Sequence, residues 1–212
     1  MNGTPAVATP RRIGLLGAES TGKTTLAEEL AHTIDAFIAE EYLRDFVRDY
    51  GRVPTLADQE GIFLTQQATV TTVTRAAAHA QVPWVVADPL PLMTAVYSIV
   101  YFDDDTLLEL GIEDARGYDL LVWCAADFAA APDPGMRDGA EIRARTDAVI
   151  ATIIAPQLPL ITLSGDTESR LAALTPLTPS PNSATFTTFS PLCSCGVRAW
   201  RRSVGKDAHR DR

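Results

Sequence analysis

The chain has 212 residues, a length that suits one domain with a sizeable hydrophobic core. Its formal net charge of −9 is unevenly placed, because residues 172–212 carry a net charge of +4 and residues 1–171 a net charge of −13. An acidic body argues against a nucleic-acid-binding surface, and no stretch has the apolar length of a membrane span. We therefore expect neither a nucleic acid nor a membrane as a partner.

The hydrophobic pattern predicts strands that alternate with helices. The expected strands are 13–16, 36–39, 84–87, 118–124 and 159–163. The expected helices are 25–34, 55–80 with an interruption at Gly61, 92–101, 105–110, 140–154 and 166–174, with a charged turn at 40–45. This alternation predicts an α/β fold of the P-loop NTPase type, with a five-stranded parallel sheet, helices on both faces and a short lid.

Composition divides the chain into an arm at 1–11, one domain at 12–174 and a tail at 175–212 rich in Pro, Ser and Thr. The arm lacks the charged-then-apolar order of a signal peptide. Three cysteines are too few for a disulfide framework, and Cys124 lies in an apolar run, so we expect a reducing, cytoplasmic compartment.

We expect the tail to be disordered, and we interpret it as an artefact or a nonfunctional extension. Two alternatives are a basic arm that binds nucleic acid and half of a metal site at Cys193 and Cys195.

Residues 17–24 read Gly-Ala-Glu-Ser-Thr-Gly-Lys-Thr and match the phosphate-binding pattern G-x-x-x-x-G-K-[ST] between a predicted strand and a predicted helix. Lys23 is the only lysine among the first 171 residues. Gly17 and Gly22 allow turns that point N–H groups at phosphates, Lys23 reaches the β and γ phosphates, and the Thr24 hydroxyl serves Mg²⁺. The expected ATP contacts are Gly17, Glu19, Ser20, Thr21, Gly22, Lys23, Thr24 and Thr25. A chance match or a decayed site is the alternative.

The segment after the second strand overlooks the acceptor side of the phosphate site. There a carboxylate at Glu41 can accept hydrogen bonds from sugar hydroxyls, and Arg44 can hold an oxygen-rich group, with Tyr42 between them. A charged helix start is the alternative. Gln66 on the long helix is a weaker candidate for the same role.

Asp88 follows the third strand, at the sheet edge where parallel α/β folds bind ligands. Its carboxylate can hold Mg²⁺ through water or accept the proton of an attacking hydroxyl. A helix cap is the alternative.

A loop hinged by glycine and proline at 133–139 carries Arg137, and Arg143 and Arg145 follow it. An arginine on a closing loop neutralises charge on a transferred phosphoryl group, so Arg137 is a candidate catalytic and ATP-binding residue and Arg143 a second ATP contact. Ordinary surface arginines are the alternative, above all for Arg145.

Segments 17–26, 41–45, 88–98 and 133–139 together resemble the NadR-type AAA ATPase and ribosylnicotinamide kinase family, over about residues 12–174. The resemblance implies a P-loop kinase that uses ATP and Mg²⁺ to phosphorylate the ribose 5′-hydroxyl of nicotinamide riboside, in NAD biosynthesis. It implies that Asp88 is the catalytic carboxylate. At position 90, where some family members carry a second carboxylate, this chain has a leucine. We expect the kinase portion alone, without the adenylyltransferase and DNA-binding portions of multidomain relatives.

Two other functions share the same phosphate loop. One is a nucleotide-binding ATPase or switch module whose output is an interaction with a protein partner. The other is a kinase of another nucleoside or of a nucleotide. Composition and spacing alone indicate neither the acceptor nor the oligomeric state.

Overall fold

The computed structural model describes residues 9–127 and 139–178. The strands are β1 (Arg11–Leu16), β2 (Ala36–Ala39), β3 (Trp84–Ala87), β4 (Leu120–Cys124) and β5 (Leu160–Leu163). The α-helices are α1 (Lys23–Ile34), α2 (Tyr42–Tyr50), α3 (Gln59–Ala80), α4 (Leu92–Phe102), α5 (Leu108–Ala115), α6 (Ala140–Val149) and α7 (Thr167–Leu174). Short helical segments occupy Leu56–Asp58, Ile150–Ile154 and Thr175–Leu177.

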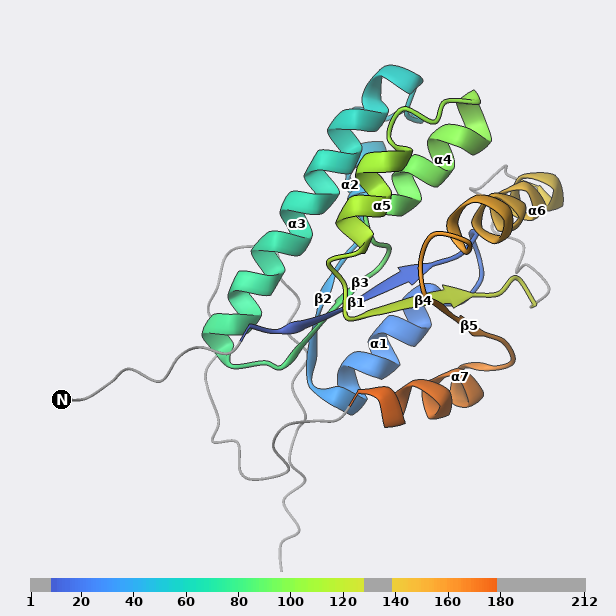
Figure 1. Ribbon diagram of the computed structural model, residues 1–212. Coiled ribbons are helices and arrows are strands. Elements are labelled where there is room, and N and C mark those ends of the chain that lie inside the picture. Colours follow the sequence, from blue (N-terminus) through green and yellow to red (C-terminus); the bar gives the residue numbers. More distant parts are fainter. Residues whose placement is uncertain (1–8, 128–138, 179–212) are drawn as a thin grey trace, which may run out of the picture.

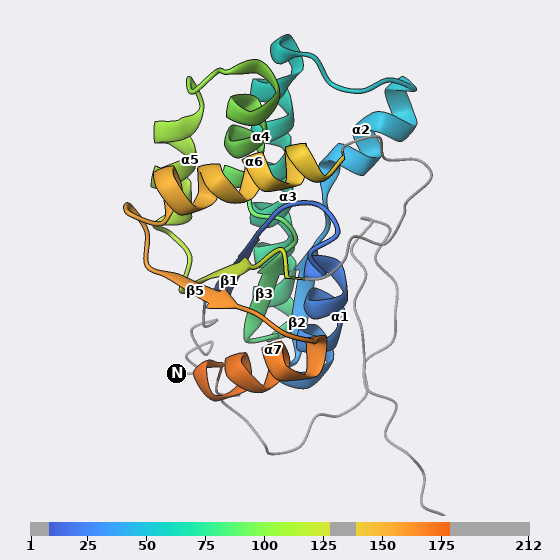
Figure 2. The ribbon, with the colours of Figure 1, turned by 90° about the vertical axis from the view of Figure 1, so that its right-hand side faces the viewer.

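The five strands form one parallel sheet in the order β2-β3-β1-β4-β5. Helices α1 and α7 cover one face, and α3, α4, α5 and α6 cover the other (Figures 1 and 2). The predicted three-layer α/β fold with a five-stranded parallel sheet is therefore confirmed. The predicted short lid at 133–139 falls almost wholly outside the described residues.

Each face of the sheet has its own hydrophobic core, because alternate residues of a strand point to opposite faces. On the α1 side, Ile13 and Leu15 of β1 pack with Leu26 and Leu30 of α1. On the other side Leu16 belongs to a larger cluster that α3, α4, α5 and α6 contribute to. Strands β1 and β3 pair in parallel between these two cores, so their carboxyl ends lie side by side at the edge where ligands bind in such sheets.

The predicted interruption of the long helix at Gly61 is wrong. A 3₁₀ turn at Leu56–Asp58 precedes α3, which then runs unbroken from Gln59 to Ala80. A glycine costs a helix only about 1 kcal/mol relative to alanine, and the packing of Phe63 and Val70 into the core outweighs that cost.

Other boundaries also differ from the prediction. The charged turn at 40–45 is the start of α2, whose Phe46 is buried. The helix predicted at 105–110 begins later, at Leu108, because residues 105–108 form a turn in which the Leu108 N–H donates to the Asp105 carbonyl. The helix predicted at 140–154 changes to π-helical geometry at Ile150. Within the described residues, no helix combines the length and the apolar character that a membrane crossing requires.

Candidate active site

The phosphate loop follows β1 and ends where α1 begins at Lys23. Gly17 and Gly22 have φ angles of 143° and 78°, values that L side chains rarely adopt. A Cβ atom on Gly17 would lie 2.6 Å from the carbonyl oxygen of Cys124 in β4. The loop therefore needs glycine at position 17 both for its backbone angle and for its close approach to the neighbouring strand.

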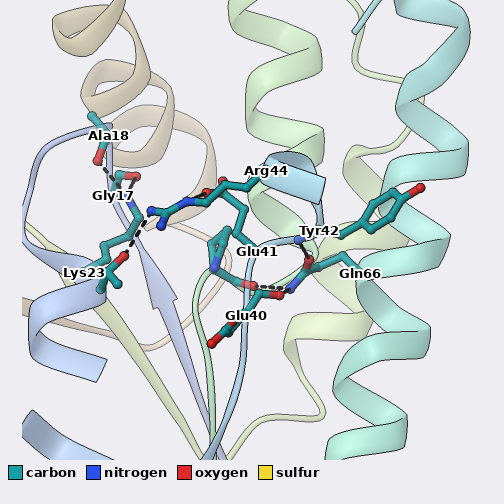
Figure 3. A network of polar contacts seen from close by, with 10 residues as sticks. Gly17, Ala18, Lys23, Glu40, Glu41, Tyr42, Arg44 and Gln66 are labelled. Atoms are coloured by element: carbon teal, nitrogen blue, oxygen red, sulfur yellow. Dashed lines mark hydrogen bonds and ion pairs between the residues drawn. The ribbon is translucent and has the colours of Figure 1, made fainter. Parts of the chain in front are cut away.

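The Lys23 side chain folds back over this loop (Figure 3). Its Nζ donates to the carbonyl oxygens of Gly17 at 2.9 Å and Ala18 at 2.7 Å. Burial lowers the pKa of the Lys23 ammonium, while the nearby carboxylates, Asp88 first and then Glu41, act to raise it. The single cation of the loop thus lies among negative charges from Asp88 and Glu41.

Asp88 comes directly after β3 and is 6% exposed. Its backbone N–H donates to the Ala39 carbonyl at 3.0 Å, which fixes its position beside the end of β2. Burial raises the pKa of the Asp88 carboxyl, and the nearby Thr24 side chain and the charge of Lys23 oppose that rise. The structure therefore brings the predicted carboxylate to the predicted Mg²⁺-binding hydroxyl.

The alternative role of Asp88 as a helix cap does not fit. The N-cap residue of α4 is Pro91, and a cis peptide bond joins Asp88 to Pro89 ahead of it. The side chain of Leu90 is fully buried in the core, so Asp88 is the acidic residue that this turn offers to the site.

Glu41 and Arg44 reach the phosphate loop from α2 (Figure 3). Arg44 Nε lies 3.0 Å from Glu41 Oε2, and Arg44 Nη2 donates to the Thr24 hydroxyl at 3.3 Å. Burial raises the pKa of the Glu41 carboxyl against the charges of Lys23 and Arg44. Glu41 is also the N-cap residue of α2, as the helix-start alternative expected. That position is compatible with its place near Lys23, and its contact with an acceptor stays a prediction.

Gln66 and Tyr42 form a brace behind this pair. The Gln66 amide accepts from the Tyr42 backbone N–H at 2.8 Å and donates to the carbonyls of Glu40 at 3.2 Å and Pro89 at 3.0 Å. At 3% exposure, Gln66 holds the start of α2 against the turn after β3. This observed role is structural, and the acceptor contacts expected of Gln66 and Tyr42 stay predictions.

Tyr97 of α4 is a site residue that the sequence analysis did not single out. Burial raises its pKa far above the ordinary value, and negative charge from Glu41, Glu19 and Asp88 adds to that rise. The phenol therefore lies within electrostatic reach of three carboxylates. An aromatic residue inside an apolar helix gives no sequence signal of this placement.

Arg170 of α7, within the part of the chain that the family resemblance covers, also lies at the phosphate loop, and it is 1% exposed. Its guanidinium donates to the Thr21 carbonyl of the phosphate loop at 2.6 Å and to the Ala125 carbonyl after β4 at 3.0 Å. A buried cation in the last helix gives no motif that sequence spacing can detect.

The predicted lid residue Arg137 lies outside the described residues, and its role stays a prediction. Arg143 lies in α6, and its ATP contact also stays a prediction. Arg145 pairs with Asp103 at the surface, as its alternative interpretation expected. Ser20 and Thr25 are exposed at the loop and the start of α1.

The described residues contain no group of three or more His, Cys, Asp or Glu side chains placed to hold a metal ion. Thr24 and Asp88 nevertheless offer two oxygen ligands near each other beside the phosphate loop. Mg²⁺ in nucleotide sites is bound by one or two protein oxygens together with phosphates and waters. These two residues fit that pattern.

A protein-family model described as an AAA domain matches residues 12–170. A solved NadR protein in complex with NAD and AMP-PNP shares the fold, with 19% identity and a TM-score of 0.62, over 86% of this chain and 52% of its own. A NadR protein in complex with NR gives 19% identity and a TM-score of 0.63, over 86% and 54%. The chain thus spans about half the length of these two structures.

A thymidylate kinase from Ehrlichia chaffeensis shares the fold at 13% identity with a TM-score of 0.53, over 79% of this chain and 97% of its own. Among curated proteins, none matches the sequence significantly. At these identities the solved structures support the fold alone.

Proposed function

Because the chain belongs to the AAA domain family, matched over residues 12–170, we propose that it is an ATP- and Mg²⁺-dependent small-molecule kinase. The proposed acceptor is the ribose 5′-hydroxyl of nicotinamide riboside. The observation that carries the proposal is the position of Asp88 beside Thr24 and Lys23, because it brings together a candidate base, a metal ligand and a phosphate-binding cation.

In this reaction the acceptor oxygen attacks the γ phosphorus of ATP. The bond from that phosphorus to the β–γ bridging oxygen breaks, ADP leaves, and the hydroxyl proton passes to the Asp88 carboxylate. Lys23 and the loop N–H groups hold the phosphates in line. Mg²⁺ held by the Thr24 hydroxyl, and by Asp88 through water, would neutralise charge on the β and γ phosphates. The raised pKa of Asp88 suits a group that accepts a proton.

The charge of the acceptor side favours a cationic acceptor. Glu19, Glu41 and Asp88 all add negative charge around Tyr97, a ring that can pack against a flat base. Nicotinamide riboside carries a positive pyridinium ring, whereas common nucleosides are neutral and nucleotides are anionic. The carboxylates therefore support nicotinamide riboside over both other classes.

The test uses purified protein with ATP, Mg²⁺ and a panel of nicotinamide riboside, uridine and uridine monophosphate. We expect phosphorylated product with nicotinamide riboside at a kcat/KM at least tenfold above that with uridine. Glu41→Gln should reduce this preference for the cation, whereas Arg116→Lys, a change at an exposed ion pair at the C-terminal end of α5, should preserve it. Absence of any phosphorylated product across the panel would refute the kinase.

The same variants separate a kinase from an ATPase switch that acts through a protein partner. Lys23→Ala should abolish nucleotide binding in both cases. Glu41→Ala and Arg44→Ala should abolish acceptor phosphorylation in a kinase but spare ATP turnover in a switch. Product formed only with uridine or its monophosphate would instead identify a kinase of another nucleoside or of a nucleotide.

A further inference from the structure

The guanidinium of Arg170 joins three loops at the carboxyl edge of the sheet. Besides Thr21 in the phosphate loop and Ala125 after β4, it donates to the carbonyl of Gly165 after β5 at 2.9 Å. The sheet order places β1, β4 and β5 next to one another, so these loops are neighbours. One side chain from α7 thus ties the phosphate loop to both adjacent loops.

Asp127 completes this connection. Its carboxylate accepts from Arg170 Nη2 at 2.5 Å and also from the backbone N–H of Gly165. The Arg170 side chain is 1% exposed and that of Asp127 31%, and replacing even a fully buried ion pair with apolar residues of similar volume is often neutral or stabilising. Stability alone is therefore a weak reason for a cation at a site that is 1% exposed.

The contact with Thr21 orients the phosphate loop itself. A trans peptide is planar, and its C=O and N–H point in opposite directions. The bond of 2.6 Å from Arg170 to the Thr21 carbonyl therefore sets the direction of the Gly22 N–H in the same peptide plane. Gly22, with φ of 78°, has no side chain to resist rotation of that plane.

We propose that Arg170 is a positioning residue for nucleotide binding, which keeps the Gly22 N–H directed at the phosphates by holding the Thr21 carbonyl on the opposite side. The role rests on the proposed function, because it presupposes that the loop binds ATP. Lysine cannot replace it, since a single ammonium cannot reproduce the planar fork that reaches Thr21, Ala125 and Gly165 together.

The experiment compares the full-length protein with Arg170→Lys, and with Arg116→Lys as a matched control at an exposed ion pair. The Kd for a nonhydrolysable ATP analogue with Mg²⁺ is measured by calorimetry, and the KM for the acceptor at saturating ATP by product formation. We expect Arg170→Lys to raise the analogue Kd at least tenfold and to change the acceptor KM less than twofold. The control should change neither.

A second readout follows the Gly22 amide directly, in protein labelled with ¹⁵N-glycine. Addition of the analogue should shift the Gly22 resonance in the wild type and shift it less in Arg170→Lys. A purely structural role would lower the melting temperature and leave both the analogue Kd and the Gly22 shift at wild-type values below that temperature, which would overturn the proposal. Asp127→Asn, which keeps its shape, should weaken analogue binding in the same direction by a smaller factor.

Failure of the two proposals is distinguishable. Wild-type protein that does not bind the analogue would sink the kinase together with the role of Arg170. Wild-type binding with an equal Kd in Arg170→Lys would overturn the role of Arg170 alone.

Discussion

Three glycines allow two contributions to the free-energy cost of a side chain in the phosphate loop to be measured, the unfavourable φ angle and the steric collision. Gly17 combines a φ of 143° with a Cβ position 2.6 Å from a backbone oxygen. Gly51, the C-cap residue of α2, has a φ of 64°, but a Cβ there meets nothing within 4 Å. Gly61 of α3 has neither constraint. Alanine at each position therefore tests the backbone angle and the collision separately.

The expected magnitudes follow from these differences. Gly61→Ala should stabilise the protein by about 0.5–1 kcal/mol, the usual gain over glycine within a helix. Gly51→Ala should cost about 1 kcal/mol for a left-handed alanine. Gly17→Ala adds a collision with the backbone of β4, for which overpacking costs about 1–3 kcal/mol, so its total should be about 3 kcal/mol.

Thermal unfolding measures these values. For a domain of this size, a change of 1 kcal/mol in stability corresponds to about 2–4 °C in Tm. The Tm should therefore fall by about 6–12 °C in Gly17→Ala and by about 2–4 °C in Gly51→Ala. If the phosphate loop of Gly17→Ala changes its conformation to relieve the collision, the Kd for the ATP analogue should rise and Tm should fall by less. A Gly17→Ala protein with the Tm of Gly51→Ala and unchanged analogue binding would refute the collision argument.

Three further predictions concern single side chains. Because burial raises the Asp88 pKa above its ordinary 3.8, the acid limb of kcat/KM should lie above that value, and Asp88→Asn should abolish the limb and lower the rate about 10²–10⁴-fold in a pH–rate profile. Gln66→Met removes the partner of one buried and two partly buried backbone groups, so urea unfolding should show a loss of roughly 2–4 kcal/mol. Hydrogen bonds from Arg52 and Thr55 lower the pKa of Asp58 in the folded protein. The stability that they add is therefore fully present at a pH above the ordinary pKa of an aspartate, and it is lost as the pH falls towards the lowered pKa of the folded protein. Asp58→Asn should therefore show a smaller stability difference between pH 7 and pH 3 than wild type.

Local pattern was enough to predict much of this molecule. The strands at 36–39 and 84–87 and the phosphate loop depend on short runs of residues whose physical demands are independent of the rest of the chain. The juxtaposition of Asp88 with Thr24 was also predictable, because parallel strands place their carboxyl ends at one edge. At Gly61, one of the places where the prediction failed, distant core packing outweighed a local preference.

The remaining site residues depend on contacts distant in sequence. Arg170 reaches the Thr21 carbonyl across 149 positions, and its burial follows from how α7 packs against α1. Tyr97 of α4 lies within the electrostatic reach of carboxylates as far away in sequence as Glu19 and Glu41. Gln66 was a weak candidate for an acceptor contact, and the partners that its side chain has are backbone groups of the site, distant in sequence.

The negative charge of the site connects the binding of its two proposed cationic ligands, Mg²⁺ and nicotinamide riboside. Lys23 is opposed by Asp88, Glu41 and Glu19, so bound polyphosphate would add more negative charge to a cluster whose carboxyl pKa values at Asp88 and Glu41 are already raised by burial. Positive charge must enter with the nucleotide for these carboxylates to stay ionised, and Mg²⁺ supplies it on the Thr24 side. A cationic acceptor supplies it on the Tyr97 side. We therefore expect nicotinamide riboside to bind more tightly in the presence of the ATP analogue than alone, a coupling that Glu41→Gln should reduce and that calorimetry of the ternary complex measures.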